Sequence, residues 1–382
     1  MTNNPFTGVL LHALGGVGHG SFYVPLKKVR RWAWESAWLV QGVAAWIVMP
    51  WLVTWLVGAR PIATLSATPW DTLGFTFLFG VMWGMGSLTF GLSMRYLGMS
   101  LGQAVALGYT VSLGTLVPPI FTGQFSQLVG NAGGITVLGG IGMCLFGIAL
   151  CGRAGVRRDR EMGSTQAGKT SLKLGFAVAT FSGVMSSGFA FGIQSGMPIA
   201  KLAEANGAPT IFKNTPIFIV VMAGGFVVNF LWCVFLGIRN RSIGDLVGRS
   251  AENNDSWTGA AEGQPAAENS LRKNYFWASL AGVIWYSGFM LYGMGATCMG
   301  AYDFASWSIH LAFVIVFSTL CGIIAREWRG VNTRTGLLVA AAMLVLILST
   351  LAIAIGNRMA GESASKATES VKPTRVYNTT EK

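Results

Sequence analysis

The chain is a series of long apolar runs separated by shorter polar connections. A helical run of about 20 residues spans a hydrocarbon core of about 30 Å, because an α-helix rises about 1.5 Å per residue. The runs must be helical, since a backbone inside lipid has no water to bond with and they lack the alternation of a lipid-facing β-strand. The pattern predicts an all-α polytopic membrane protein with ten transmembrane helices, at approximately 6–26, 36–57, 72–95, 99–121, 131–151, 173–196, 211–238, 274–297, 302–325 and 335–356.

Three polar stretches lie outside this apolar pattern. Residues 153–172 are predicted to form a cytoplasmic connecting loop. Residues 239–273 are rich in Gly, Asn and Ser, a composition typical of a long flexible cytoplasmic loop. Residues 357–382 have the composition of a polar, disordered tail. We expect none of the three to form a further domain.

An internal repeat relates the two halves of the chain. At a constant offset of 202 residues, the segments 80–91 and 282–293 share Gly80/Gly282, Val81/Val283, Trp83/Trp285, Gly86/Gly288 and Gly91/Gly293. At an offset of 167, the first run shares with the sixth Gly8/Gly175, Gly16/Gly183, Val17/Val184 and Phe22/Phe189. Five runs are followed by five related runs, and because five is odd the second set crosses the membrane in the opposite sense. This predicts a 5+5 inverted repeat, with halves at 1–152 and 173–356 and a site between them near the midplane.

Composition and charge support this interpretation. Hydrophobic residues make up 52% of the chain and charged residues 11%, whereas a soluble domain has roughly 25% charged residues. The net charge of +12 would suit nucleic acid, but 19 of the 27 Lys and Arg residues lie in connections on the side of Lys27. The positive-inside rule makes that side cytoplasmic. We therefore predict a multi-pass protein of a bacterial inner membrane, with both termini periplasmic and no nucleic-acid partner.

The first basic cluster and the cysteines narrow the interpretation further. No Lys or Arg precedes the first run and the cluster at 27–31 follows it, so the run is not a cleavable signal. That cluster is predicted to anchor the topology, with Glu35 as an ion-pair partner. The five Cys residues form no CxxC pair, which indicates neither a disulfide framework nor a zinc site.

One acidic residue falls inside an apolar run. Fourteen of the fifteen Asp and Glu residues lie in loops, tails or span ends, whereas Asp303 stands where the ninth run has begun. An intramembrane carboxylate costs about 2.5–3.5 kcal/mol on insertion scales. Asp303 either caps the helix toward water or accepts a transported proton, since desolvation favours the protonated form. Ser306, Trp307 and His310 follow on the same helix face, and we expect Asp303 and His310 to carry proton coupling.

Other polar and aromatic residues inside the runs are candidate ligands. His12 and His19 are seven residues apart and share a helix face, where they either bridge helices or line a cavity; nothing completes a metal site with them. Gln103 and Gln194 either bond between helices or bind a polar ligand, because an amide both donates and accepts. Trp285 has a repeat mate in the first half, so it either packs as that mate does or lines the cavity.

Three long stretches of the chain resemble a known family. The L-rhamnose/proton symporters, a ten-helix branch of the drug/metabolite transporter superfamily, have stretches similar to HALGGVGHGSFYVPLKKVRRWAWESAW, FGVMWGMGSLTFGLSMRYLGMSLG and AYDFASWSIHLAF. The resemblance covers nearly all of residues 6–356. This sequence departs at Ser87, where Asn is expected, and in its longer loop and tail. The resemblance implies a proton-coupled uptake carrier for L-rhamnose or a close 6-deoxyhexose, whereas composition and periodicity alone indicate only a secondary transporter.

We expect the sugar to bind between the two halves. The predicted contacts are Gln103, Trp285, Asp303, Trp307 and His310, joined by His12, Ser87, Tyr286 and Gln194. The coupling ion is a proton, and no cofactor, metal or obligatory protein partner is expected. The alternative within transporters is an exporter or exchanger of another small metabolite. An enzyme is disfavoured because the runs contain no HExxH, GxSxG or paired carboxylates, and a channel because an inverted repeat with one titratable group suits alternating access.

Overall fold

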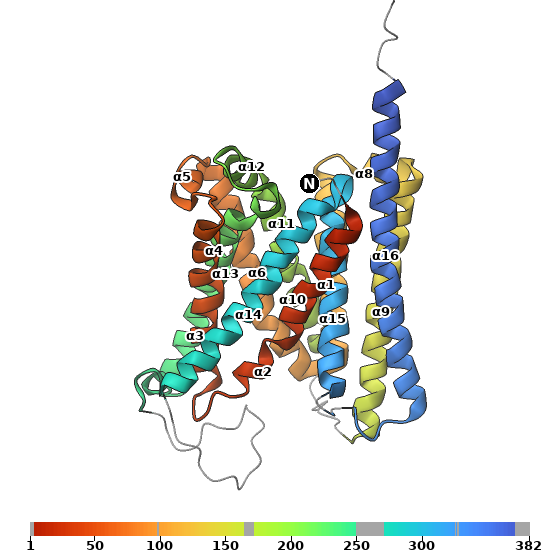
Figure 1. The fold of residues 1–382 in the computed structure, drawn as a ribbon. Coiled ribbons are helices and arrows are strands. Elements are labelled where there is room, and N and C mark those ends of the chain that lie inside the picture. The colour runs from red at the N-terminus through yellow and green to blue at the C-terminus, as the bar shows by residue number, and fades with distance from the viewer. Residues whose placement is uncertain are drawn as a thin grey trace, which may run out of the picture.

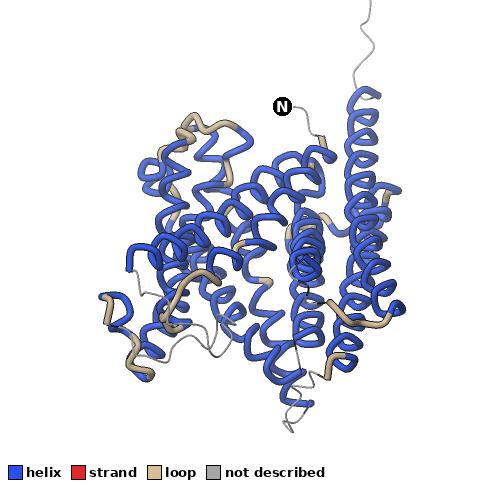
Figure 2. Tube along the Cα trace, turned by 60° about the horizontal axis from the view of Figure 1, so that its bottom comes forward, coloured by secondary structure: helices blue, strands red, loops and turns tan. Residues whose placement is uncertain are grey.

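A computed structural model describes residues 4–97, 99–163, 172–249, 271–324, 326 and 328–370. Within these ranges all regular secondary structure is helical (Figures 1 and 2), which confirms the prediction of an all-α protein for the described residues. Eight helical segments are long and apolar enough to cross a membrane, namely Trp34–Leu56, Trp70–Ser93, Gly102–Phe121, Ala132–Glu161, Lys173–Ala205, Thr210–Arg239, Asp303–Ile324 and Thr333–Glu362.

The described part of the first half contains ten helical elements. They are α1 (Pro5–Ser21), α2 (Tyr23–Leu26), α3 (Trp34–Gly42), the π-helical η1 (Val43–Val48), α4 (Met49–Leu56), α5 (Pro61–Ser66), α6 (Trp70–Leu97), α7 (Met99–Phe121), α8 (Phe125–Gly130) and α9 (Ala132–Glu161). The start of α1 is capped by the Asn4 side chain, which accepts from the backbone N–H of Phe6 at 3.1 Å. Asn131 caps α9 in the same way, accepting from Gly134 N–H at 2.8 Å.

The described part of the second half continues the helical pattern. Its elements are α10 (Leu172–Ser186), α11 (Gly188–Ser195), α12 (Met197–Ala205), the short η2 (Thr210–Phe212), α13 (Thr215–Arg239), η3 (Ile243–Val247), α14 (Leu271–Cys298), η5 (Gly300–Ala305), α15 (Ser306–Ile324) and α16 (Thr333–Ser370). Two predicted spans, at 6–26 and 274–297, are not among the eight segments above. The reason is that α1 has only 17 residues and α14 is rich in Trp, Tyr, Ser and Gly.

Two helices run further than the apolar pattern predicts. Helix α9 continues to Glu161, so the predicted start of the loop at 153–172 is wrong. Helix α16 continues to Ser370, so the predicted disorder of residues 357–370 is wrong as well. Charged residues end an apolar run without ending a helix, since Arg, Glu, Lys and Met are good helix formers. An Arg158–Asp159 pair at 2.8 Å and an Arg358–Glu362 pair at 2.9 Å lie on these extensions. The remainders, 164–171 and 371–382, lie outside the described residues.

The start of the long loop is packed rather than flexible, which corrects the prediction for 239–249. Asp245 in η3 is 1% exposed and accepts from Ala33 N–H at 2.7 Å and Ser36 Oγ at 3.1 Å. Glu35 accepts from Asn240 Nδ2 at 2.9 Å and Ser242 Oγ at 2.6 Å. The described residues contain no ion pair to Glu35, so its predicted pairing with the basic cluster is wrong in this structure. The rest of the loop, 250–270, lies outside the described residues.

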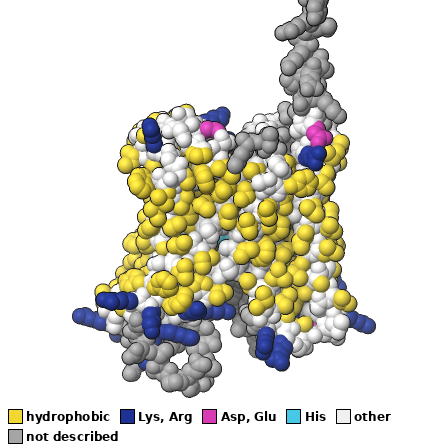
Figure 3. Space-filling model, in the orientation of Figure 1, with side chains coloured by type: hydrophobic (Ala, Val, Ile, Leu, Met, Phe, Trp, Pro, Cys, Tyr) yellow, Lys and Arg dark blue, Asp and Glu magenta, His cyan; other side chains and the backbone are white. Residues whose placement is uncertain are grey.

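The helices pack in a bundle with two chemically different ends. The exposed cations at what we call the basic end include Lys27, Lys28, Arg239, Arg241, Arg272, Lys273, Arg326 and Arg329 (Figure 3). The surface between the ends is mainly hydrophobic, as lipid contact requires. The start of α1 and the far end of α16 both point to the opposite end, where α16 extends beyond the other helices, and α9 stands beside α16 (Figure 1). Near the centre, α1 packs against α14 and α15, while α10 packs against α6 and α7.

Candidate functional site

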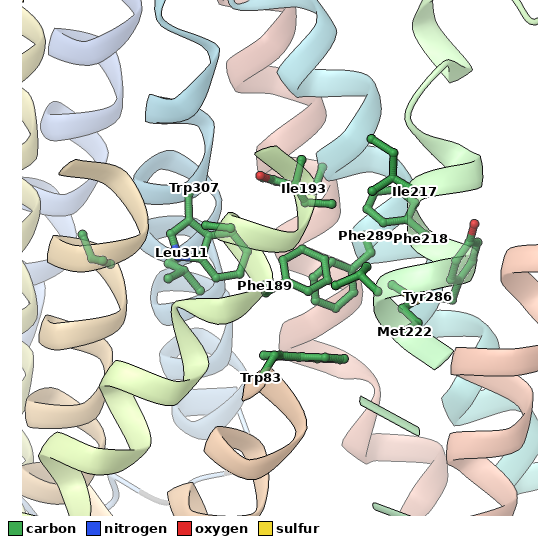
Figure 4. Close-up of a cluster of buried hydrophobic side chains, with 14 of the residues drawn as sticks. Trp83, Phe189, Ile193, Ile217, Phe218, Met222, Tyr286, Phe289, Trp307 and Leu311 are labelled. Carbon is green, nitrogen blue, oxygen red and sulfur yellow. The ribbon is translucent and has the colours of Figure 1, made fainter. Parts of the chain in front are cut away.

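A cluster of aromatic rings fills the centre of the bundle (Figure 4). Phe189 of α11 stacks on Trp307 of α15 with ring centroids 5.2 Å apart, and lies 4.4 Å from Phe289 of α14. The Trp307 indole N–H donates to the Thr110 carbonyl at 3.3 Å. A Cβ at Gly114 would lie 2.7 Å from that indole, so glycine leaves the room that Trp307 occupies. The position of Trp307 is therefore fixed by a ring stack, a hydrogen bond and a glycine.

Two adjoining cavities lie at the end of the bundle opposite the basic end. The inner one has a volume of about 30 Å³ and is lined by residues that include Gln194, Asn214, Tyr292, Asp303 and Trp307. Such a volume holds about one water molecule, so a larger ligand requires the helices to move. The outer cavity, about 150 Å³, is lined by Met197, Lys213, Asn214, Ala296, Thr297, Gly300 and Asp303.

Asp303 lines both cavities, from the η5 turn that precedes α15. The structure brings together three predicted site residues there, Gln194, Asp303 and Trp307. Sequence reasoning missed Asn214, whose Nδ2 donates to the Gly293 carbonyl at 3.0 Å while its buried Oδ1 has no hydrogen-bond partner within the described residues. An uncharged amide at the edge of an apolar run is the signal that found Gln194, and it could have found Asn214 too.

The three histidines of the chain meet at one helix interface. His12 and His19 project from α1, and His310 from α15. The distance from His19 Nδ1 to His310 Nε2 is 2.8 Å, and the His12 ring centroid lies 5.9 Å from that of His310. Tyr292, which sequence reasoning also missed, has its ring 5.6 Å from His12 and 5.2 Å from His310. Bridging between helices, one of the two interpretations left open for the α1 histidines, is therefore what His19 does.

The other predicted residues lie outside the paired cavities. Trp285 lies beside the histidine cluster, with its ring 5.3 Å from His19. Tyr286 is fully buried and lies on the far side of Phe289 from Trp307 (Figure 4). Ser87 is a half-buried residue of α6. Because α14 turns by about 100° per residue, adjacent residues such as Trp285 and Tyr286 face different neighbours.

Gln103 lies in a separate cavity toward the basic end. This cavity has a volume of about 210 Å³ and is lined by residues that include Gln103, Cys151, Arg158, Ser318 and Trp328. The Arg158 guanidinium lies 5.0 Å from the centre of the Trp328 ring. In this conformation Gln103 and Asp303 therefore do not share a cavity, although the sequence predicts that they contact the same sugar.

A packed layer separates the cavities of the two ends. Along α15, Trp307 lines the inner cavity and Ile315 the basic-end cavity, while Ser308–Leu311 between them are buried. On α7, Thr110 and Val111 are likewise buried between the two sets of lining residues. Thr115 Oγ1 and Ser308 Oγ bridge the two helices at 2.7 Å. Passage from one end to the other thus requires this layer to rearrange.

Within the described residues no group of His, Cys, Asp or Glu side chains is arranged to hold a metal ion. The three histidines lie close together, yet their contacts are a ring-to-ring hydrogen bond and aromatic packing. Chemically, the region offers a carboxyl, two amides, aromatic faces and imidazoles. These groups can bind a hydroxylated ligand and hold protons.

Comparison with known proteins identifies the family. The family described as L-rhamnose-proton symport protein (RhaT) matches residues 1–361. A protein of Cronobacter sakazakii named L-rhamnose-proton symporter is 34% identical over 364 residues, which cover 93% of this chain and 99% of that relative. Proteins of the same name from Escherichia coli and Yersinia pestis are 33% and 32% identical, with the same coverage. The motif resemblance is thereby confirmed: this chain belongs to the L-rhamnose-proton symport protein family.

Proposed function

We propose that this protein takes up L-rhamnose, or a closely related 6-deoxyhexose, together with protons across a bacterial inner membrane. The observation that carries the proposal is the inner cavity, where Asp303 lies with Gln194, Asn214 and Trp307 in a protein of this family. A sugar has apolar C–H faces that suit an indole ring and hydroxyls that suit amides. A carboxyl in the same cavity can change its proton occupancy when the sugar enters.

We propose that Gln194, Asn214, Asp303 and Trp307 contact the sugar when it enters from the outer cavity. The unpaired Oδ1 of Asn214 supports this role, because it leaves an acceptor free for a hydroxyl. His12, His310 and Trp285 do not line the inner cavity, and the ring of Tyr292, which does, lies beside the two histidines. Ser87 and Tyr286 do not line it either and remain candidates that require helix movement to reach the sugar. The basic-end cavity offers the same sugar the amide of Gln103 and the hydroxyls of Ser318 and Thr319. We propose that the sugar leaves the protein through this cavity.

The transport cycle we propose is alternating access between two halves related by a 5+5 inverted repeat. Ten spans arise if α1 and α14 cross the membrane with the eight longer or more apolar segments, as in the drug/metabolite transporter superfamily. The helix contacts support the repeat. In it α1 corresponds to α10, α6 to α14 and α7 to α15, and α1 packs on α14 and α15 as α10 packs on α6 and α7. Further support comes from single residues, because Gly86 abuts Ser186 and Gly288 abuts His19. Both pairs obey the sequence offsets of 202 and 167.

Proteoliposomes that hold the purified protein are expected to accumulate L-rhamnose above its external concentration when the interior is alkaline. Accumulation should collapse with a protonophore, because the gradient supplies the work. Gln194→Leu keeps the side-chain size but removes donor and acceptor, and should weaken sugar binding about tenfold, the effect of one or two lost hydrogen bonds. Gln124→Leu, at the start of α8, is the matched control. Equilibration without accumulation would contradict symport, and preference for an unrelated metabolite would favour the exporter or exchanger.

We also propose that the basic end faces the cytoplasm, so that both termini are periplasmic. The excess of exposed Lys and Arg at that end supports this orientation. In a variant without native cysteines, Ala67→Cys at the opposite end should react with an impermeant maleimide in intact cells. Arg272→Cys at the basic end should react only after permeabilisation. The reverse labelling pattern would overturn the orientation.

A further inference from the structure

We infer that His12, His19 and His310 form a second proton-binding site, centred on the His19–His310 pair and separate from Asp303. The inference rests on the proposed function, because symport supplies the proton. It is carried by the short contact between two imidazoles, by the unpaired ring nitrogens around it, and by an equivalent helix interface that contains no histidine.

Several ring nitrogens of the histidine cluster have no hydrogen-bond partner among the described residues. In the 2.8 Å contact between two neutral rings, one nitrogen donates its proton and the other accepts it. His310 Nδ1 and both nitrogens of His12 are buried with no hydrogen-bond partner in the described part of the chain. Buried polar atoms are normally paired, so unpaired ones mark a functional or strained site. A cluster that served only to join helices would not leave these three ring nitrogens unsatisfied.

The internal repeat provides a comparison within the same molecule. At the offset of 167, His12 corresponds to Ala179 and His19 to Ser186 on α10. The contacts correspond as well. Ser182, the equivalent of Gly15, donates its Oγ hydrogen bond to the Gly86 carbonyl at 2.9 Å. Gly15 faces the carbonyl of Gly288, the equivalent of Gly86, and a Cβ at Gly15 would lie 2.8 Å from it.

The position equivalent to His310 is also small. Gly16 packs on Phe313 as Gly183 packs on Ala106 and Tyr109. If Phe313 therefore corresponds to Tyr109, His310 corresponds to Ala106, which is fully buried. The interface of α1 with α14 and α15 contains three imidazoles. At the equivalent positions, the interface of α10 with α6 and α7 has Ala179, Ser186 and Ala106. Close packing in this fold does not itself require histidine.

The surroundings determine what a proton would do at the pair. An added proton occupies the free ring nitrogen of one imidazole and leaves the pair with one positive charge, which strengthens the bond between the rings. The groups that face the cluster from α14 are Trp285, Phe289 and the titratable Tyr292. Aromatic faces attract a cation weakly. Asp303, in the η5 turn that precedes α15, is the acid nearest to His310 in the sequence. The described residues contain no ion pair to any of the three rings.

A charged pair in this closed interface therefore lacks a counter-ion and water. Burial of an uncompensated charge is costly, so the protonated pair favours conformations in which α1 separates from α14 and α15 and water enters. The closed interface seen here suits the neutral pair. Protonation and the position of α1 are thus linked, which adds a second proton-sensitive element to the one at Asp303.

The test uses the full-length protein in lipid with ¹⁵N-labelled histidine, which gives signals from only three rings. Ring ¹⁵N shifts distinguish N–H, bare nitrogen and imidazolium. Across the pH range in which the protein transports L-rhamnose, the signals of His19 and His310 should change together, and L-rhamnose should move the midpoint. Asp303→Asn should leave this titration in place. A pair that stays neutral throughout, or whose titration vanishes in Asp303→Asn, would overturn the inference.

A transport variant separates proton binding from helix bridging. Asn places its amide near the position of Nδ1 and Gln near that of Nε2, so His19→Asn with His310→Gln keeps the bridge but cannot titrate. This double variant should bind L-rhamnose yet accumulate it about tenfold less or worse, as loss of coupling predicts. Ser186→Asn, at the position equivalent to His19, is the control and should accumulate normally. Normal accumulation by the double variant would contradict the inference, whereas absence of rhamnose transport by the unmodified protein would contradict the proposed function instead.

Discussion

Asp303→Asn is expected to abolish uphill accumulation of L-rhamnose while it preserves exchange of sugar across the membrane. A neutral sugar does not respond to the membrane potential, whereas a co-transported proton gains about 2.3 kcal/mol per 100 mV. Asp303 lines both cavities at the end opposite the basic end, where it can meet proton and sugar. Asn mimics the protonated carboxyl, so the variant should bind sugar without the alkaline loss of affinity expected of the unmodified protein. Gradient-driven uptake and counterflow, measured in the same proteoliposomes, check this expectation.

Asp71→Asn is the matched control for that experiment. Asp71 is an exposed acid in the first turn of α6 and lines neither cavity. Its replacement should leave accumulation and pH dependence unchanged. If Asp303→Asn still accumulates sugar with normal pH dependence, coupling belongs to another group. The histidine cluster would then be the first candidate, ahead of Glu35, whose carboxylate is occupied by Asn240 and Ser242.

Gly80→Ala and Gly282→Ala are each expected to destabilise the protein strongly. A Cβ at Gly80 would overlap the Val221 carbonyl oxygen of α13, and a Cβ at Gly282 would lie 2.5 Å from the Gln41 carbonyl oxygen of α3. Both obstacles are backbone atoms of neighbouring helices, which cannot turn aside as a flexible side chain can. Overpacking of this kind costs about 1–3 kcal/mol and occasionally more. Thermal unfolding of the purified variants in detergent, compared with the unmodified protein, measures the effect.

Gly74→Ala and Gly91→Ala are the controls for this pair. Both glycines lie in α6, and a Cβ at either position would meet nothing within 4 Å. Alanine is favoured over glycine inside a helix by about 0.5–1 kcal/mol, so these variants should be neutral or slightly more stable. If Gly80→Ala unfolds at the same temperature as its controls, then α6 and α13 are further apart in the membrane than in this structure.

The sequence by itself determines the helical character of the chain. Apart from the far ends of α9 and α16, the apolar runs predict where the long helices lie, because lipid leaves the backbone no alternative hydrogen-bonding partner. The sequence also determines that Asp303 is exceptional, since one carboxyl at the start of an apolar run needs no structure to be noticed. The sequence analysis does not predict the extensions of α9 and α16, because a polar composition does not distinguish an exposed helix from a loop.

Only the tertiary structure decides which polar side chains meet. Periodicity shows that His12 and His19 share a face of α1, but not that this face meets His310 of α15, almost 300 residues away. It treats Gln103 and Gln194 alike, although one lines the basic-end cavity and the other lies with Asp303. The physical reason is that a sequence specifies the angle of a side chain about its own helix axis. Which helix lies at that angle, and at what depth, depends on how closely glycines such as Gly15 and Gly288 let the helices approach.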